Sequence, residues 1–133
     1  MFLGIFDGRN RTLCYSNAGH NPPVILGRGG SLKLSEGGLP LGILKGVSYI
    51  EGRQVLEPGD LLLLYTDGAI EAADPDGREF GLDRILALLQ QHRDGRDLGE
   101  LIQRMVSKVS DWTQGSAQQD DITIVLARAV EGR

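Results

Sequence analysis

Apolar and polar residues follow one another in the first half of the chain in a way that predicts β-strands separated by turns. A hairpin is expected first, with a turn at residues 7–10. A second, shorter hairpin is expected after the break at Asn21-Pro22-Pro23. The predicted strands lie at residues 2–6, 12–18, 24–26, 32–34 and 47–56.

The strongest strand signal is Leu61–Tyr65, a run of five apolar residues that follows the tight turn Glu57-Pro58-Gly59-Asp60. Burial of such a run fixes the backbone at its end, where Asp67 and Gly68 follow. Gly68 allows either a turn or a close approach to a ligand. The run therefore predicts an acid that is held rigidly at the end of a buried strand.

The apolar pattern changes to helical spacing after residue 80. One helix is predicted by Leu82, Ile85, Leu86 and Leu89. A second helix, with Asp97 as its N-cap, is predicted by an apolar stripe made of Leu98, Leu101, Ile102, Met105, Val106, Val109 and Trp112.

A last strand is predicted at residues 122–126, where Ile122, Ile124 and Leu126 alternate with their neighbours. The order of strands, two helices and a strand is an α+β pattern of antiparallel strands with helices on one face. At 133 residues, residues 1–133 are expected to form a single domain. A chain of this length buries about two thirds of its unfolded surface without needing disulfides.

Composition and charge exclude several classes of partner and location. The formal net charge is −4 and the basic residues are scattered, which argues against nucleic acid or an anionic membrane as the main partner. The single cysteine, Cys14, is expected to be a small buried hydrophobe in a reducing compartment. The apolar start, Met1–Phe6, has no positive flank and ends at Asp7, so we expect neither a signal peptide nor a membrane span. The default location is the cytoplasm.

Two acidic points flank apolar strands. Asp67 follows Leu61–Tyr65, and Asp120-Asp121 precede the strand at residues 122–126. Carboxylates fixed at strand ends supply the oxygen ligands that hard cations prefer. Each point alone is more simply explained by turn residues. A metal site is therefore predicted only if the fold brings Asp67 and the Asp120-Asp121 pair together.

Other polar segments are interpreted as structural. In Asn17–Pro23 a histidine stands between two asparagines, which favours a turn whose His20 ring bonds the backbone; the alternative is a rigid active-site loop. His92 is expected to be a solvated surface group. Asp74-x-Asp76-Gly77-x-Glu79 lacks the full ligand pattern of a calcium loop and predicts a turn. The sequence contains no Walker-type phosphate loop, HExxH, paired CxxC or GxSxG motif.

Five segments carry recognisable motifs, and they are Asn17–Pro23, Gly38–Gly42, Leu56–Glu71, Phe80-Gly81 and Asp120–Thr123. In this order they resemble the SpoIIE-type serine phosphatases, the bacterial branch of the metal-dependent PP2C-like (PPM) protein phosphatases. The resemblance extends from Phe2 to about Arg128. Its most specific parts are Tyr-Thr-Asp-Gly-x-x-Glu at residues 65–71 and Asp-Asp-Ile-Thr at residues 120–123.

The resemblance implies an α-β-β-α sandwich with two Mn²⁺ or Mg²⁺ ions at one end. Asp67 and Asp120 match metal-binding aspartates of the family. Asp121 stands where related phosphatases often carry asparagine, which favours a supporting role beside the metal. A metal-bridging water would attack the phosphorus of phosphoserine or phosphothreonine, with no protein nucleophile. The implied substrate is a phosphorylated protein, such as a STAS-type anti-sigma factor antagonist, in stress or sporulation signalling.

The resemblance also implies that the N-terminal part of the family domain lies upstream of Met1, with a further Asp-centred metal motif and two outer helices. Asp67 and Asp120 supply two carboxylates, whereas a two-metal site needs more oxygen ligands. The sequence therefore predicts weak Mn²⁺ binding and little or no phosphatase activity for this chain alone. Uncovered sheet edges further predict self-association, with a symmetric dimer as one form.

Two other functions agree with the sequence. One is a non-catalytic regulatory or interaction module that has the phosphatase fold. The other is a strand-rich structural domain whose acids are only turn residues. The substitution Asp67→Asn separates the enzyme from the structural domain, because only in an enzyme should it abolish activity while folding survives.

Overall fold

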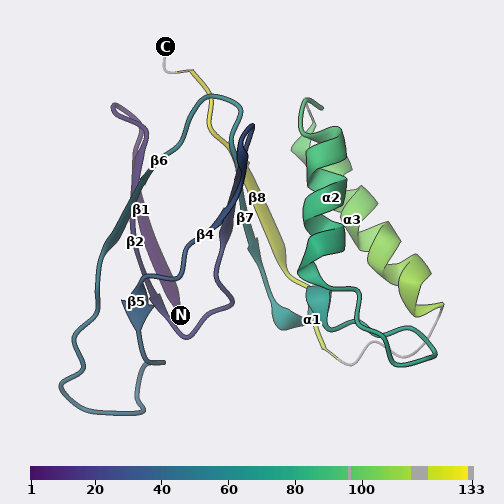
Figure 1. Ribbon diagram of the computed structural model, residues 1–133, viewed down its shortest axis with the longest axis horizontal. Helices are drawn as coiled ribbons and strands as arrows, with labels where there is room; N and C mark the ends of the chain where they lie inside the picture. The colour runs from purple at the N-terminus through teal and green to yellow at the C-terminus, as the bar shows by residue number, and fades with distance from the viewer. Residues whose placement is uncertain (96, 115–119, 132–133) are drawn as a thin grey trace. The chain divides into compact units, whose positions relative to one another are not determined.

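The computed structural model describes residues 1–95, 97–114 and 120–131 (Figure 1). Over these residues the chain has eight strands and three helices, which confirms the predicted α+β class. The chain divides into two compact units. The first contains residues 1–62 and the end of the chain from residue 128, and the second contains residues 63–127.

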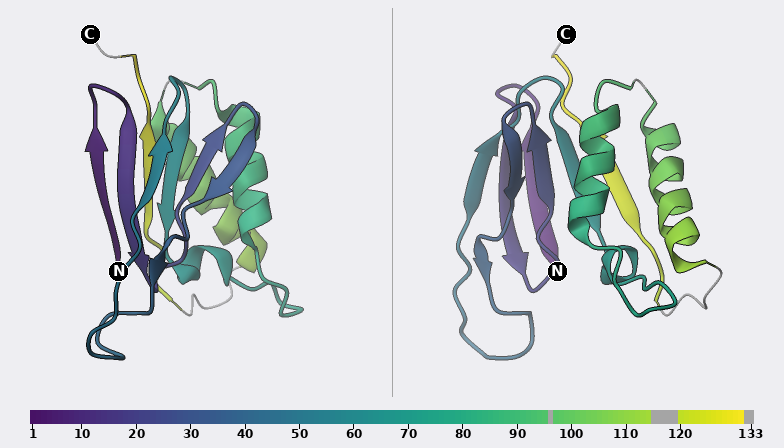
Figure 2. Two further views of the ribbon diagram at one scale, coloured as in Figure 1. Left: turned by 60° about the vertical axis from the view of Figure 1, so that its left-hand side comes forward. Right: turned by 45° about the vertical axis from the view of Figure 1, so that its right-hand side comes forward.

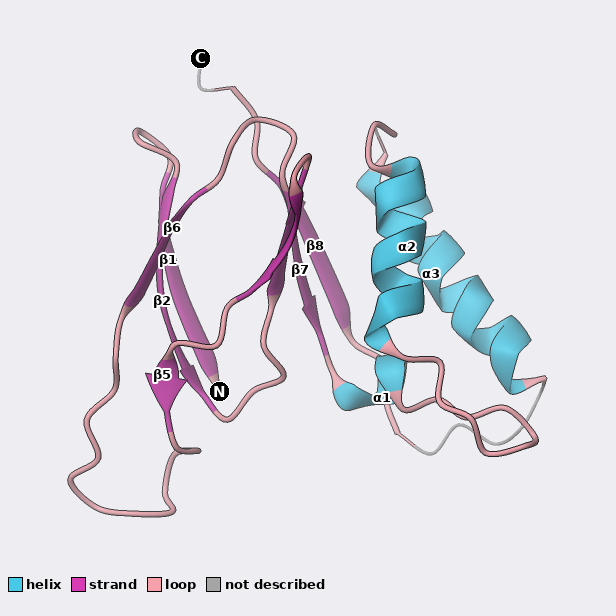
Figure 3. Ribbon diagram, in the orientation of Figure 1, coloured by secondary structure: helices cyan, strands magenta, loops and turns pink. Residues whose placement is uncertain are grey.

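The first unit contains β1 to β6, which Figure 3 draws in magenta. β2 is the central strand of its sheet. β2 pairs antiparallel with β1 on one side, where Phe2 lies opposite Asn17, and antiparallel with β6 on the other. β3 and β4 form an antiparallel hairpin that is not part of this sheet. The bounds are β1 Phe2–Asp7, β2 Thr12–Ala18, β3 Val24–Gly27, β4 Gly30–Lys33, β5 Gly37–Gly38 and β6 Gly52–Val55.

Two predictions for this unit were wrong in part. The extended segment predicted at residues 47–56 contains a strand only at β6, Gly52–Val55. The strands are also not all antiparallel, because β5 pairs in parallel with the end of β2, Asn17–Ala18. Both differences depend on pairing partners far away in the sequence, which local alternation does not encode.

The core of the first unit is built on one face of β2. Leu13 and Tyr15 are buried there, and the rings of Phe2 and Tyr15 stack with centroids 5.6 Å apart. Cys14 points to the opposite face because neighbouring side chains alternate along a strand. It is half-buried, so the prediction of a buried cysteine was wrong. The buried cluster is completed by Ile25, Leu34, Leu56 and Ala129.

The second unit contains most of β7 and β8, which are hydrogen-bonded neighbours in a sheet, and the three helices. Leu61, Leu63 and Tyr65 alternate as the buried residues of β7, as expected for a strand of this pattern. β8 begins at residue 124, two residues later than the predicted start at 122. The bounds are β7 Leu61–Tyr65, α1 Asp67–Ile70, α2 Leu82–His92, α3 Leu98–Thr113 and β8 Ile124–Arg128.

The two predicted helices are confirmed as α2 and α3, which lie side by side (Figure 2). Asp97 is the N-cap of α3, as predicted, because its Oδ1 accepts hydrogen bonds from the N–H groups of Gly99 at 2.8 Å and Glu100 at 3.2 Å. Among the described residues, no helix has the length and apolarity that a bilayer span requires. The helices bury Ile85, Leu89, Leu101, Met105 and Val109.

The predicted turn at Asp74–Glu79 is confirmed, and its centre is a buried carboxylate. Asp74 Oδ1 accepts hydrogen bonds from the N–H groups of Asp76 at 3.0 Å and Arg78 at 2.8 Å, and Oδ2 accepts one from Arg78 Nε at 2.8 Å. Burial raises the pKa of Asp74, but the hydrogen bonds and positive charge of Arg78 outweigh it, and the pKa lies below its ordinary value. The Asp74 carboxylate is therefore an internal acceptor that holds the turn.

The substitution Asp74→Asn is expected to lower stability at pH 7 and to weaken its dependence on pH. Because the pKa of Asp74 is lower in the folded protein, its ionised form stabilises the fold above the ordinary value of about 4. This contribution disappears as pH falls below that value through the folded-state pKa. Denaturant unfolding from pH 7 to pH 2 measures the effect, with the exposed Asp83→Asn as a control. Equal pH profiles for the wild type and Asp74→Asn would contradict this account.

Candidate metal centre

Asp67 lies where β7 ends, and the structure places it at the first position of α1 rather than in an open turn. Its side chain is exposed. The N–H of Gly68 donates to Asp67 Oδ1 at 3.1 Å, and the N–H of Glu71 donates to the Asp67 carbonyl at 2.8 Å. Since buried β7 residues precede it and these bonds follow it, the backbone of Asp67 is fixed on both sides.

Thr66 joins this turn to the segment that precedes β8. Its hydroxyl donates to the carbonyl of Asp121 at 3.1 Å and accepts the N–H of Thr123 at 3.0 Å. Its own N–H donates to the carbonyl of Thr123 at 3.1 Å. Thr123 is therefore bonded to the end of β7 before β8 begins.

Gly68 packs directly on the same segment. A Cβ atom at Gly68 would lie 2.5 Å from the carbonyl oxygen of Asp121 and 3.0 Å from that of Asp120. Real Cβ atoms do not approach backbone this closely, so only glycine fits without rearrangement. The sequence predicted a turn or a close approach to a ligand at this glycine, and the structure has a close approach to the chain's own backbone.

The fold thus brings together the two segments that carry the predicted acids. Asp120 and Asp121, like Asp67, are exposed at this point. Carboxylate oxygens fit a hard divalent cation by their chemistry. In the described part of the chain, however, no group of three or more His, Cys, Asp or Glu side chains is arranged to hold a metal ion. The carboxylate oxygens of these acids are of the kind that binds Mn²⁺ or Mg²⁺. They are fewer than the oxygen ligands that such ions need.

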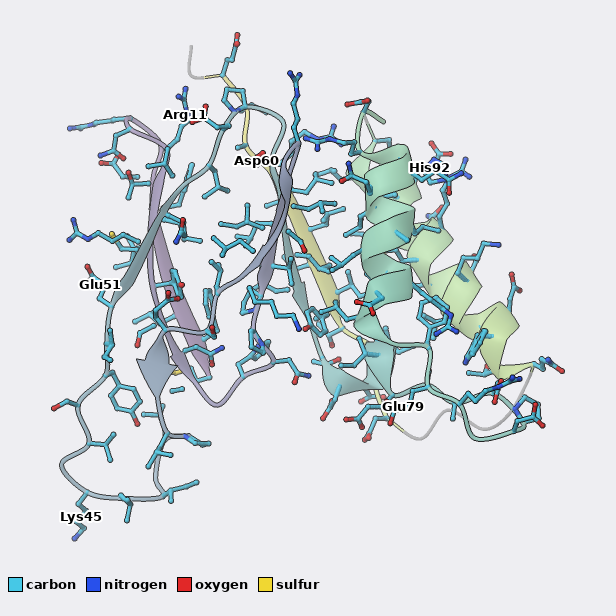
Figure 4. The ribbon with its side chains drawn as sticks, in the orientation of Figure 1. Arg11, Lys45, Glu51, Asp60, Glu79 and His92 are labelled. Atoms are coloured by element: carbon cyan, nitrogen blue, oxygen red, sulfur yellow. The ribbon has the colours of Figure 1, made fainter. Side chains whose placement is uncertain are left out.

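The Phe80-Gly81 motif hydrogen-bonds the end of α1 and the residue pair after it, and it also contacts α3. The N–H of Phe80 donates to the carbonyl of Ala72, and the N–H of Gly81 donates to the carbonyl of Ile70, both at 2.8 Å. Phe80 is buried and meets Trp112 of α3 edge to face, with ring centroids 5.9 Å apart. Figure 4 labels Glu79 on this same loop. These contacts anchor the helix that begins with Asp67.

Trp112 and Arg84 strengthen that anchor. Trp112 Nε1 donates to the carbonyl of Arg78 at 2.9 Å. The Arg84 guanidinium lies 4.2 Å from the centre of the Trp112 ring, and its Nη1 donates to the carbonyl of Phe80 at 2.6 Å. The loop before α2 is therefore held by its backbone and by two side chains of the helices.

In the first unit, the Asn17–Pro23 segment is a turn held by its own polar groups. Asn17 is buried, its Oδ1 accepts the His20 N–H at 2.8 Å, and its Nδ2 donates to the His20 carbonyl at 3.0 Å. His20 Nδ1 lies 2.6 Å from the Asn21 carbonyl. The predicted backbone-bonded histidine is confirmed. The Gly38–Gly42 motif begins where β5 pairs with Asn17–Ala18, so these two motifs meet in this unit.

His92 is less exposed than predicted. It is half-buried at the end of α2 rather than fully solvated (Figure 4). The reason is the neighbouring start of α3, because His92 lines a groove there with Glu100, Leu101 and Arg104. None of these residues belongs to the motifs that resemble the phosphatases.

The sequence did not predict the roles of Thr66 and Gly68. Both belong to the motif at residues 65–71, but their partners lie more than fifty residues away in the chain. A threonine directly before a helix is expected to cap it. The side chain of Thr66 makes no cap bond to α1, so this general rule gives the wrong role for Thr66.

Residues 1–130 match the family model described as Stage II sporulation protein E (SpoIIE). The chain is 30% identical over 126 residues to Protein IcfG of Synechocystis and 27% identical over 135 residues to the phosphoserine phosphatase RsbU of Bacillus subtilis. These alignments cover 94% and 96% of the chain. The chain spans only 20% and 38% of the length of these two relatives.

The structure resembles the Mn-presoaked phosphatase domain of the cell fate determinant SpoIIE from Bacillus subtilis, with a TM-score of 0.67 and 18% sequence identity. The match covers 100% of this chain and 57% of that domain. The α+β fold of two sheets and three helices therefore corresponds to part of the PP2C phosphatase fold. The chain belongs to the SpoIIE family of PP2C-type serine/threonine phosphatase domains.

Proposed function

We propose that this chain is the part of a metal-dependent phosphoserine/phosphothreonine protein phosphatase that carries Asp67 and Asp120. The observation that supports this most strongly is the packing of Thr66–Gly68 on the Asp120-Asp121 backbone. It joins two motifs that the SpoIIE family places at its metal-binding end. The similarity to the phosphoserine phosphatase RsbU points to the same chemistry.

In this proposal Asp67 and Asp120 contribute carboxylate ligands to Mn²⁺ or Mg²⁺, and further ligands come from outside the described residues. Bound divalent ions supply an activated water and offset negative charge on the phosphoryl group. Asp121 acts through its backbone, because its carbonyl is bonded to Thr66. The chain's own contribution is to hold two exposed acids on a fixed backbone. The Mn-presoaked SpoIIE phosphatase domain supports manganese as the metal.

The proposed substrate is a phosphorylated protein, with a STAS-type anti-sigma factor antagonist as the first candidate. The family resemblance supports this choice, as does the similarity to RsbU. Stress or sporulation signalling in the cytoplasm is the corresponding setting.

For this chain alone we expect weak Mn²⁺ binding and little or no phosphopeptide turnover, because Asp67 and Asp120 supply too few ligands for two ions. Isothermal titration with Mn²⁺ and a phosphate-release assay measure both. Asp67→Asn should remove the weak binding, and Asp83→Asn, which changes another exposed acid in the first turn of a helix, should leave it unchanged. Robust turnover by the chain, or equal Mn²⁺ binding by Asp67→Asn, would contradict the proposal.

We also expect the chain to self-associate through β1. Among the described strands, β1 pairs on one side only, and its Leu3, Ile5 and Phe6 are exposed. An edge strand with exposed apolar side chains favours pairing with another chain. Light scattering should give a mass above that of a monomer, and Ile5→Lys should lower it. A monomeric mass at moderate protein concentration would count against this expectation.

A second candidate is a non-catalytic module that has the phosphatase fold. It is favoured by one observation, that no metal-binding group of three side chains exists among the described residues. A longer polypeptide that contains this chain distinguishes the two candidates, because only the enzyme gains phosphatase activity when the missing ligands are added.

A further inference from the structure

Thr66 stands in the position of a helix N-cap without acting as one. Its backbone is extended, with φ −94° and ψ 163°, directly before α1. Threonine in this position usually accepts a hydrogen bond from the first turn of the helix. The side chain of Thr66 makes no such bond.

The hydroxyl of Thr66 instead donates one hydrogen bond to a distant segment of the chain and accepts another from it. It donates to the Asp121 carbonyl at 3.1 Å and accepts from the Thr123 N–H at 3.0 Å. A hydroxyl oxygen can donate and accept strong hydrogen bonds at a single atom, which a methyl group cannot. With the backbone bond from Thr66 to Thr123, this makes three hydrogen bonds between two short segments.

The bridge joins residues that stand directly beside the two acid-bearing positions of the candidate centre. Asp67 directly follows Thr66, and Asp120 directly precedes the residue whose carbonyl accepts the Thr66 hydroxyl. Gly68, the residue after Asp67, is packed against the carbonyl groups of Asp120 and Asp121. A change in the Thr66 bridge would therefore move one acid-bearing segment relative to the other.

We infer that Thr66 is a positioning residue of the metal centre, whose hydroxyl bridge sets the spacing of the Asp67 and Asp120 segments. The inference rests on the proposed function. The hydroxyl carries this role and the methyl group does not, so serine should replace threonine and valine should not. Groups that hydrogen-bond metal ligands directly typically change metal affinity about 10- to 100-fold when they are mutated. Thr66 bonds residues beside the proposed ligands, so we expect an effect near the lower end of this range.

The test is an NMR titration of the full chain with Mn²⁺ alone, in which paramagnetic broadening is followed at the amides of residues 67–71 and 120–121. Thr66→Val is expected to raise the Mn²⁺ concentration for half-broadening by about 10-fold or more. Thr66→Ser is expected to stay close to the wild type. A purely structural role would lower the stability of Thr66→Val and leave the Mn²⁺ dependence of its folded form unchanged.

The outcomes separate the inference from the proposed function. If the wild type binds no better than Asp67→Asn, the metal site is refuted and the inference with it. If the wild type binds better than Asp67→Asn but Thr66→Val equals the wild type, only the inference is overturned. If Thr66→Val does not fold, Thr66→Ala, which also lacks the hydroxyl, replaces it in the titration. A rise of about 10-fold in the Mn²⁺ concentration for half-broadening supports the inference, and an unchanged concentration overturns it.

Discussion

Gly68→Ala is expected to destabilise the protein by about 3 kcal/mol or more, at or above the upper end of the usual cost of overpacking. The added Cβ would lie 2.5 Å from the Asp121 carbonyl oxygen, and that neighbour is backbone, which cannot move aside as the end of a flexible side chain can. Relief of the clash requires the segment before β8 to shift. The same shift would break the hydrogen bonds of Thr66, so Mn²⁺ binding should fall together with stability.

Urea unfolding of the variant and the wild type measures this effect. Gly8→Ala and Gly29→Ala are matched controls, because a Cβ at either position would meet no heavy atom within 4 Å beyond the adjoining residues of the chain. Both controls are expected to stay within about 0.5 kcal/mol of the wild type, as is usual for surface positions. If Gly68→Ala were as stable as these controls, the close packing of Gly68 on Asp121 would be refuted.

Asp67→Asn, placed in a longer polypeptide that supplies the remaining part of the domain, is expected to reduce phosphatase turnover about 100-fold or more. A metal ion contributes several kcal/mol to the transition state of phosphoryl transfer, and each 1.4 kcal/mol is a tenfold change in rate. Folding should survive, because Asp67 is exposed and its Oδ1 accepts a bond from the Gly68 N–H that an asparagine oxygen can also accept.

Turnover of a phosphopeptide in Mn²⁺, with circular dichroism of the same samples, gives both quantities. Asp83→Asn serves as the control, since this exposed acid lies in the first turn of α2 outside the family motifs. Normal turnover by Asp67→Asn would mean that the acid is only a turn residue. A longer polypeptide without any turnover would instead favour the non-catalytic module.

Local pattern was sufficient to predict most elements of the fold. The strand at Leu61–Tyr65 and both long helices were predicted within a few residues, because side-chain periodicity reports burial directly. Asp97 was predicted as a cap because capping involves neighbours in sequence. The parallel pairing of β5 and the late start of β8 were not predicted, since each depends on a partner distant in the chain.

At the candidate site, too, features set by local sequence could be predicted and contacts between distant residues could not. The metal-ligand roles of Asp67 and Asp120 stay predictions, which rest on residue type, on their place beside strands and on the family resemblance. The contacts of Thr66 and Gly68 were not predicted, because nothing nearby in the sequence indicates that these two residues meet residues 120–123.

The bond between the Thr66 hydroxyl and the Thr123 N–H joins residues 57 positions apart, and this has a kinetic consequence. Closing so long a loop costs more conformational entropy than forming the helices α2 and α3, whose contacts are local in sequence. The helices should therefore form early in folding, and the Thr66–Thr123 hydrogen bonds should form late. Interactions absent from the transition state act mainly on the unfolding rate. A cation that binds beside the Thr66–Thr123 hydrogen bonds should therefore lengthen the lifetime of the native state and leave the folding rate almost unchanged.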